Sequence, residues 1–178
     1  MIHAYYGNGK GKTTAAVGLA IRAAGAGRRV LFAQFLKSGQ TSELNILEKI
    51  PNIECLAVAK MQGFLFEKTE AEKEQIINDI KKQLQGIEEW IKIVSANSGS
   101  DDKILVVMDE VLHCLKMSVI DEEKFIESIL RIGKQTEIVL TGAEPSAKLN
   151  CHLDYVTEMV SHKHPYERGI AARPGIEY

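Results

Sequence analysis

The sequence predicts a three-layer α/β fold with a mainly parallel sheet. Short apolar runs of strand length alternate along the chain with longer stretches of helical spacing, an order typical of such folds. A glycine-rich segment joins the first strand to the first helix, and a later apolar run ends in two acids. The 178 residues suffice for one sizeable core, so we expect a single domain over residues 1–178.

Composition argues against several classes of function. The formal net charge is −2 and no long basic block occurs, which disfavours nucleic acid as a partner. No apolar run reaches membrane-spanning length, and Met1 leads directly into a strand rather than into a signal peptide. Cys55, Cys114 and Cys151 show no C-x-x-C spacing, as expected for reduced thiols. We therefore expect a cytoplasmic protein without membrane contact.

The first strand and the first helix flank the glycine-rich segment. Ile2 to Tyr6 is an apolar strand, and Lys12 to about Ala26 is a helix rich in small residues. Backbone N–H groups of such a loop, together with the helix N-terminus, cradle phosphate oxygens. A lysine adds a full charge, and a threonine hydroxyl is a hard ligand suited to Mg²⁺ or Mn²⁺. The expected phosphate-binding residues are Gly7, Asn8, Gly9, Lys10, Gly11, Lys12, Thr13 and Thr14.

The loop departs from the general pattern G-x-x-x-x-G-K-[ST] at its entrance. Gly11, Lys12 and Thr13 fit the end of the pattern, but Tyr6 stands where the first glycine belongs. A tyrosine does not take the positive φ angles open to glycine, so we expect Gly7 and Gly9 to make the turn. The alternative is a surface turn rich in glycine and lysine, which the flanking strand and helix disfavour.

The second strand and the helix after it come next. Arg29 to Phe35 is apolar enough for a strand that is buried on both faces. It leads into Gln34-Phe35-Leu36-Lys37, at the end of the strand where open α/β sheets bind ligands. Ser42 is a suitable N-cap for a helix from Glu43 to Ile50.

The middle of the chain contains a strand, a loop and a long helix. We expect a strand from Ile53 to Ala59. Phe64 and Phe66 follow in a loop, where the aromatic rings either serve a binding site or turn into the core. Thr69 begins a helix that runs to Asn97, with apolar residues at helical spacing.

The run from Ile104 to Met108 is the clearest strand in the sequence. It ends in Asp109 and Glu110, and acids at the carboxyl end of such a strand complete a magnesium–nucleotide site. We expect Thr13, Asp109 and Glu110 to hold the metal, and the alternative is a helix cap at the strand end. His113 either reaches the same site or is a partly buried histidine with a structural partner.

The last third of the chain continues the alternation. The expected elements are a helix from Glu122 to about Ile132 capped by Asp121, a strand from Glu137 to Leu140, a short helix from Ser146 to Leu153 and an edge strand from Tyr155 to Met159. His162 and His164 alternate in the tail without acid or Cys partners at ligand spacing. That arrangement favours structure or substrate positioning over a metal site.

Several segments together resemble one enzyme family. The loop from Gly7 to Thr14 is similar to that of the P-loop ATP:corrinoid adenosyltransferases. The other similar segments are Gln34-Phe35-Leu36-Lys37, Gly63-Phe64, Met108-Asp109-Glu110, Thr141-Gly142, Asp154-Tyr155-Val156-Thr157-Glu158-Met159, Lys163-His164-Pro165, Gly169-Ile170, Ala172-Arg173 and Gly175-Ile176-Glu177-Tyr178. The resemblance therefore covers nearly the whole chain.

The resemblance implies a RecA-like P-loop fold, usually as a homodimer, and a specific reaction. The family transfers the 5′-deoxyadenosyl group of ATP to Co(I) of a reduced corrinoid and releases triphosphate. Adenosylcobalamin or a related adenosylcorrinoid is the product, and a reductase such as a flavoprotein supplies the electrons. Because cobalt is the nucleophile, the protein needs neither a covalent nucleophile nor a general base. The resemblance also implies that ATP lies reversed in the loop relative to most P-loop enzymes.

The resemblance assigns roles to individual residues. Catalytic roles fall to Lys12, Thr13 and Glu110, and the corrinoid site to Gln34, Phe35, Lys37, Phe64 and Phe66. Arg22 lies near the nucleotide in the family, although an exposed arginine on a helix needs no such role. Glu43 and Asn45 face the active site by the same resemblance, or else form an ordinary polar helix face. Ala143 stands where the family often has an arginine, so a phosphate contact from that position is missing.

Two other classes of function fit a P-loop as well. One is a kinase or ATPase that acts at the γ-phosphate, and it would produce ADP. The other is a regulatory module that binds ATP without chemistry. The fold alone does not choose among these functions.

Overall fold

A parallel sheet forms the middle layer of the structure. The computed structural model describes residues 1–37, 41–57, 68–97, 104–134 and 136–176. Within these residues six strands pair in the order β3-β2-β4-β5-β1-β6, and every pairing is parallel. The strands are β1 (Ile2–Tyr6), β2 (Val30–Gln34), β3 (Ile53–Ala57), β4 (Ile104–Asp109), β5 (Thr136–Gly142) and β6 (Tyr155–Glu158). The predicted α/β class with a parallel sheet is confirmed.

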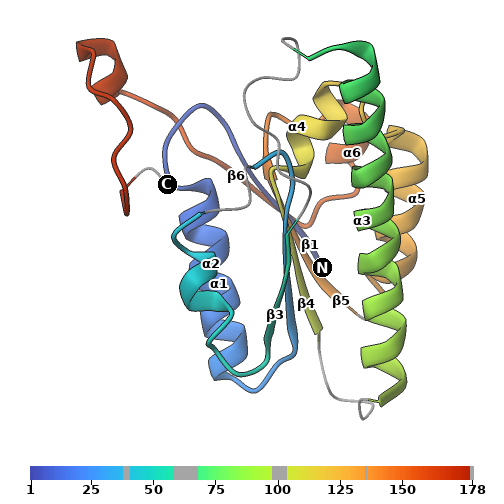
Figure 1. The fold of residues 1–178 in the computed structure, drawn as a ribbon. Helices are drawn as coiled ribbons and strands as arrows, with labels where there is room; N and C mark the ends of the chain where they lie inside the picture. The colour runs from blue at the N-terminus through green and yellow to red at the C-terminus, as the bar shows by residue number, and fades with distance from the viewer. Residues whose placement is uncertain (38–40, 58–67, 98–103, 135, 177–178) are drawn as a thin grey trace.

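Helices cover both faces of this sheet. Figure 1 shows α1 (Lys12–Gly25) and α2 (Leu44–Leu47) on one face, and α3 (Glu70–Asn97) and α5 (Glu122–Ile132) on the other. The shorter α4 (Val111–Lys116) and α6 (Ala147–Asn150) lie on the α3 side, and a 3₁₀ turn, Pro165–Arg168, lies in the tail. No helix in the described part of the chain combines the length and apolarity needed to cross a bilayer.

The two inner strands are buried on both faces, which explains their continuous apolar sequence. Every residue of β2 and of β4 is buried. Along β2, Val30 and Phe32 join the core under α1, whereas Leu31 and Ala33 join the core under α3. This alternation is the two-residue period of a strand between two helical layers.

Small and apolar faces attach the helices to the sheet. Ala16, Ala20, Ala23 and Ala24 of α1 are buried, and their small side chains let this helix lie close against the strands. In α3 the buried apolar residues recur at helical spacing, and Thr69 and Glu72 form the expected capping box at its start. The predicted aromatic loop with Phe64 and Phe66 lies outside the described residues.

Several elements differ from the sequence prediction; α6, for example, covers Ala147–Asn150 where a helix from Ser146 to Leu153 was expected. The helix α2 covers only Leu44–Leu47, and Glu43, not Ser42, occupies its N-cap position without a side-chain cap bond. The Glu43 carboxylate instead accepts hydrogen bonds from Gln34 and Lys37, at the end of β2. The helix α4 was not predicted, because its six residues are too few to show helical periodicity.

The strand order sets up one edge for ligand binding. The strands β1, β5, β4 and β2 are neighbours, and all run in the same direction. Their carboxyl ends therefore bring the glycine-rich loop, Asp109 and the residues after Gln34 to the same edge of the sheet.

Candidate nucleotide site

The glycine-rich loop begins one residue later than the general pattern suggests. Tyr6 is the last residue of β1 and pairs with Gly142 on one side and Glu158 on the other. The positive φ angles occur at Gly7 (112°) and Gly11 (115°). Tyrosine is tolerated because its position belongs to the strand. Gly7 turns the chain as predicted, but Gly9 does not, since its φ is not positive.

Gly9 is needed for close approach rather than for turning. A Cβ atom on Gly9 would lie 2.7 Å from the carbonyl carbon of Met159, and one on Gly7 would lie 2.4 Å from the Met159 oxygen. The Gly9 N–H donates to that oxygen over 2.7 Å, and the Met159 N–H donates to Tyr6 over 2.8 Å. The segment after β6 is therefore packed directly on the glycine-rich loop.

Lys12 and the start of α1 face the centre of the loop. The Lys12 ammonium donates to the carbonyl oxygens of Gly7 (2.8 Å) and Gly9 (2.9 Å). Gly11 occupies the N-cap position without a side-chain bond, and the first turn of α1 carries no acid. The free N–H groups and the positive end of the helix dipole are thus available to an anion.

Asp109 is the buried charge of the site. Its carboxylate is fully buried at the end of β4. The hydroxyls of Thr13 (2.9 Å) and Thr141 (2.7 Å) donate to Oδ1, and the Lys37 ammonium lies 2.8 Å from Oδ2. The structure thus joins the loop, β2, β4 and β5 through one carboxylate.

A second layer of polar contacts holds Gln34 and Lys37 in place. The Gln34 amide donates to Glu43 over 2.9 Å and accepts from the Thr41 hydroxyl over 2.8 Å. Lys37 lies 3.4 Å from Glu43. Burial opposes the charge of Lys37, but Asp109 and then the acids Glu43 and Glu110 outweigh it and raise the lysine pKa.

Glu43 also remains charged in this setting. Burial acts to raise its pKa, whereas its own backbone hydrogen bond, Lys37, Gln34 and Thr41 together lower it. Of the two expectations for this residue, the structure supports a position at the site. Asn45 is exposed on α2.

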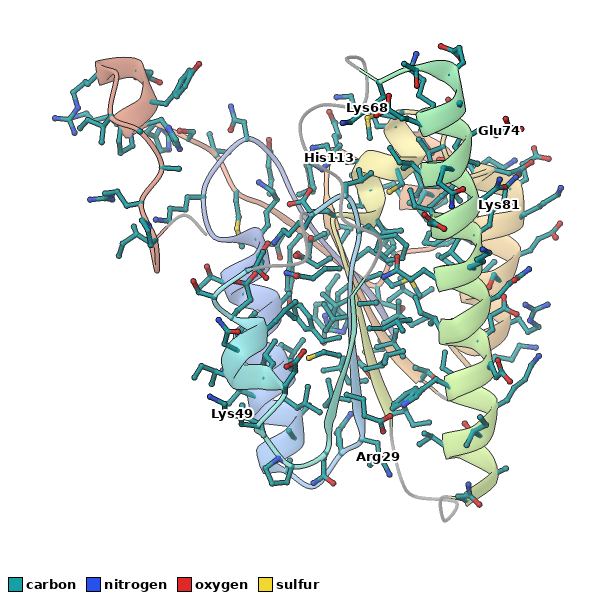
Figure 2. All side chains as sticks on the ribbon, in the orientation of Figure 1. Arg29, Lys49, Lys68, Glu74, Lys81 and His113 are labelled. Atoms are coloured by element: carbon teal, nitrogen blue, oxygen red, sulfur yellow. The ribbon has the colours of Figure 1, made fainter. Side chains whose placement is uncertain are left out.

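Glu110 takes a different place from Asp109. Its φ of 67° is left-handed, and its N–H donates to the Thr141 hydroxyl over 2.9 Å. The carboxylate lies 2.5 Å from Nδ1 of His113 at the carboxyl end of the sheet (Figure 2). Burial acts to raise the Glu110 pKa, but the contact with His113, then Lys37 and Lys12, lower it. His113 is partly buried and, through Glu110, also reaches the predicted site, so the structure agrees with both expectations for this residue.

Gly142 allows this histidine to approach the sheet. Its φ is 135°, and a Cβ atom there would lie 2.8 Å from Nδ1 of His113. Thr141 and Gly142 therefore play different structural roles at the end of β5. The threonine hydroxyl binds Asp109, and the glycine leaves room for α4.

The remaining predicted site residues lie in the core, on the surface of α1 and around the glycine-rich loop. Phe35 is 0% exposed in the core, where it packs instead of facing solvent. Arg22 is exposed in the last turn of α1, about 15 Å along the helix from Lys12 at about 1.5 Å per residue. Asn8, Lys10 and Thr14 are exposed around the loop.

Sequence reasoning missed three polar residues of the site. They are Thr41, Gln83 and Thr141. Gln83, buried on α3, donates to the backbone oxygens of Gln34 (3.0 Å) and Leu56 (3.1 Å) and so ties the ends of β2 and β3 together. Of the three, only Thr141 could have been recognised from the sequence, because it is a polar residue at the end of an apolar strand.

The donor set fits a magnesium–nucleotide complex. Thr13 and Asp109 offer hard oxygens, and the carboxylate already holds a cation in the form of the Lys37 ammonium. Among the described residues no group of three His, Cys, Asp or Glu side chains could hold a metal by itself. A metal here would take further ligands from phosphate.

These features define a P-loop nucleotide-binding domain. The model of the family described as "ATP:corrinoid adenosyltransferase BtuR/CobO/CobP" matches residues 1–178. The chain therefore belongs to the ATP:corrinoid adenosyltransferase family.

Individual relatives agree with this assignment. A corrinoid adenosyltransferase of Pseudomonas aeruginosa is 30% identical over 97% of this chain and 80% of its own. The corrinoid adenosyltransferase CobA of Salmonella typhimurium is 31% identical over 100% of this chain and 85% of its own.

One solved structure shares the fold. It contains ATPases 2 and 3 of EssC from Geobacillus thermodenitrificans, with a TM-score of 0.51 and 18% identity over 98% of this chain and 34% of that chain. This likeness supports the P-loop fold and carries no information on activity.

Proposed function

We propose that this protein transfers the 5′-deoxyadenosyl group of ATP to Co(I) of a corrinoid and releases triphosphate. The product is adenosylcobalamin or a related adenosylcorrinoid. One observation carries the proposal: Lys12, Thr13 and Asp109 meet at a P-loop in a chain that matches the corrinoid adenosyltransferase family over its whole length.

The loop residues bind the triphosphate. Lys12 leaves the carbonyl oxygens of Gly7 and Gly9 for phosphate oxygens, and the N-terminus of α1 adds N–H donors. Thr13 and Asp109 hold Mg²⁺ or Mn²⁺, with Glu110 nearby as a further acid. When bound, the metal neutralises charge on the departing triphosphate.

The chemical step needs alignment more than acid–base chemistry. The Co(I) electron pair forms a bond to C5′, and the C5′–O bond breaks with its electron pair leaving on the triphosphate. The protein holds C5′ in line with cobalt, and Lys12 stabilises the charge on the leaving group. Glu110 is in contact with His113, which fits a positioning role better than the activation of water.

The corrinoid lies above the same edge of the sheet. We assign its contacts to Gln34, Lys37, Phe64 and Phe66, of which the first two border the metal position. The enzyme works as a homodimer in the cytoplasm, and a reductase such as a flavoprotein supplies Co(I). These assignments follow from the family and from the position of β2.

The test is formation of the cobalt–carbon bond. ATP, Mg²⁺ and chemically reduced cobalamin are incubated with the enzyme, and the light-sensitive absorbance of the alkylcobalamin is followed. We expect this absorbance to grow and to disappear on illumination. ATP binding without any such product would favour a regulatory module, and ADP formation without it would favour a kinase or ATPase.

A further inference from the structure

We propose that the Lys37 ammonium occupies the metal position beside Asp109 in the nucleotide-free protein, and that a divalent cation bound with ATP displaces it. The proposal rests on the metal site of the proposed function. It gives Lys37 a part in deciding when the metal binds.

The geometry around Lys37 resembles that of a bound cation. Its Nζ lies 2.8 Å from Asp109 Oδ2, 3.4 Å from Glu43 Oε1 and 3.4 Å from the Thr13 hydroxyl. Two of these groups are the oxygens that the proposed function gives to the metal. A lysine and a divalent ion cannot hold the same side of this carboxylate at once.

The charge balance explains why Lys37 is there. Asp109 is 0% exposed, and a buried carboxylate without a positive partner is strongly destabilising. Thr13, Thr141 and Gln34 contact this carboxylate as neutral donors. Among its contacts with described residues, Lys37 supplies the only full positive charge. A metal ion that entered would take over this role.

Lys37 is also placed to move. It follows β2, and its side chain is 23% exposed, whereas the Asp109 side chain is 0% exposed. A flexible lysine can withdraw toward solvent or toward a phosphate while the carboxylate stays fixed. The metal alone must therefore compete with the ammonium, and ATP phosphates tip the balance by adding ligands and by attracting the released lysine.

The direct test measures metal binding without nucleotide. Mn²⁺ is titrated into the nucleotide-free protein, and free Mn²⁺ is read from its EPR signal. We expect Lys37→Met to bind Mn²⁺ at least about tenfold more tightly than the wild type, because a charge-assisted bond no longer has to be broken. Equal Mn²⁺ affinity in the two proteins would overturn the proposal.

A matched control separates this effect from a general change in charge. Lys49 is exposed, and Figure 2 shows it at the end of the molecule away from His113 and the site. We expect Lys49→Met to bind Mn²⁺ like the wild type. A gain in this control equal to that of Lys37→Met would mean that net charge alone is responsible, and it would overturn the proposal.

A stability measurement covers the case in which Lys37→Met folds poorly. The variant leaves Asp109 buried without its cation, so its melting temperature should be lower than that of the wild type. Millimolar Mg²⁺ should raise the melting temperature of the variant more than that of the wild type, because binding to the native state stabilises it. An identical response to Mg²⁺ in both proteins would contradict the displacement.

The result can be distinguished from a failure of the proposed function. A tighter Mn²⁺ site in Lys37→Met, together with no alkylcobalamin formed by the wild type, would support the displacement and reject the reaction. Metal-dependent formation of alkylcobalamin by the wild type, with no gain of Mn²⁺ affinity in the variant, would do the reverse.

Discussion

Asp109 illustrates how single residues hold this site together. Its buried carboxylate is contacted by two threonine hydroxyls and an ammonium that come from α1, β5 and the end of β2. Breaking a buried charged network costs several kcal/mol, of order 3–5 kcal/mol for a pair that loses one partner. The site is therefore preorganised around a charge that the fold cannot leave unpaired.

At the same scale, Lys12 should be essential for ATP use. We expect Lys12→Ala to reduce kcat/KM at least about tenfold, because a charge-assisted contact to phosphate is worth about 1.5–3 kcal/mol. ATP affinity from isothermal titration should fall in parallel. Lys49→Ala is the control, and kinetics in Lys12→Ala that match this control would remove the loop from the mechanism.

The cysteines offer a test of local environment. Burial, with the charge of Glu110, raises the pKa of Cys114 to about 12, and burial with Glu48 raises the pKa of Cys55 to about 11. A raised thiol pKa means that little reactive thiolate exists at pH 8 and that more forms as the pH rises. Cys151 is exposed.

We expect iodoacetamide at pH 8 to label native protein at Cys151 first, with Cys55 and Cys114 labelled only after unfolding. Peptide mass spectrometry identifies the site, and Cys151→Ser provides the control. Rapid labelling of Cys114 in the native protein would contradict the buried position of this thiol.

Among the elements, the glycine-rich loop depends on the chain segment after β6. Gly9 donates to Met159, Asn8 accepts from the Ser161 N–H over 2.9 Å, and the chain then runs away from the sheet (Figure 1). The loop is thus held from outside by hydrogen bonds to the segment after β6, and from inside by Lys12. The contacts with Met159 and Ser161 link the N-terminal loop to the C-terminal part of the chain, whereas those of Lys12 stay within the loop.

This packing predicts opposite effects for two glycines. A Cβ on Gly9 would meet the backbone of Met159 and Val160 at 2.7–2.9 Å, whereas nothing lies within 4 Å of one on Gly18. We expect Gly9→Ala to lower the free energy of unfolding by about 1–3 kcal/mol, and Gly18→Ala, inside α1, to raise it by about 0.5–1 kcal/mol. Urea denaturation measures both. Equal stabilities for the two variants would contradict the close approach of Met159.

For the whole molecule, the sequence predicted the layers better than the contacts between them. Continuous apolar runs marked β2 and β4 because both faces of these strands are buried, and β1 was predicted with the bounds it has. The polar partners of Asp109 could not be predicted in full. Thr141 lies on β5 and Lys37 follows β2, so both are far from Asp109 in sequence, and no local pattern pairs either residue with this carboxylate.

The central claim concerns which bond of ATP breaks. Attack at C5′ releases all three phosphates as one unit, and it requires no activated water. Phosphorus NMR of a reaction with ATP, Mg²⁺ and Co(I) cobalamin tests this most directly. We predict one triphosphate for each adenosylated corrinoid and little ADP when corrinoid is absent. A stoichiometric ADP or AMP signal would contradict adenosyl transfer and indicate chemistry at another phosphate.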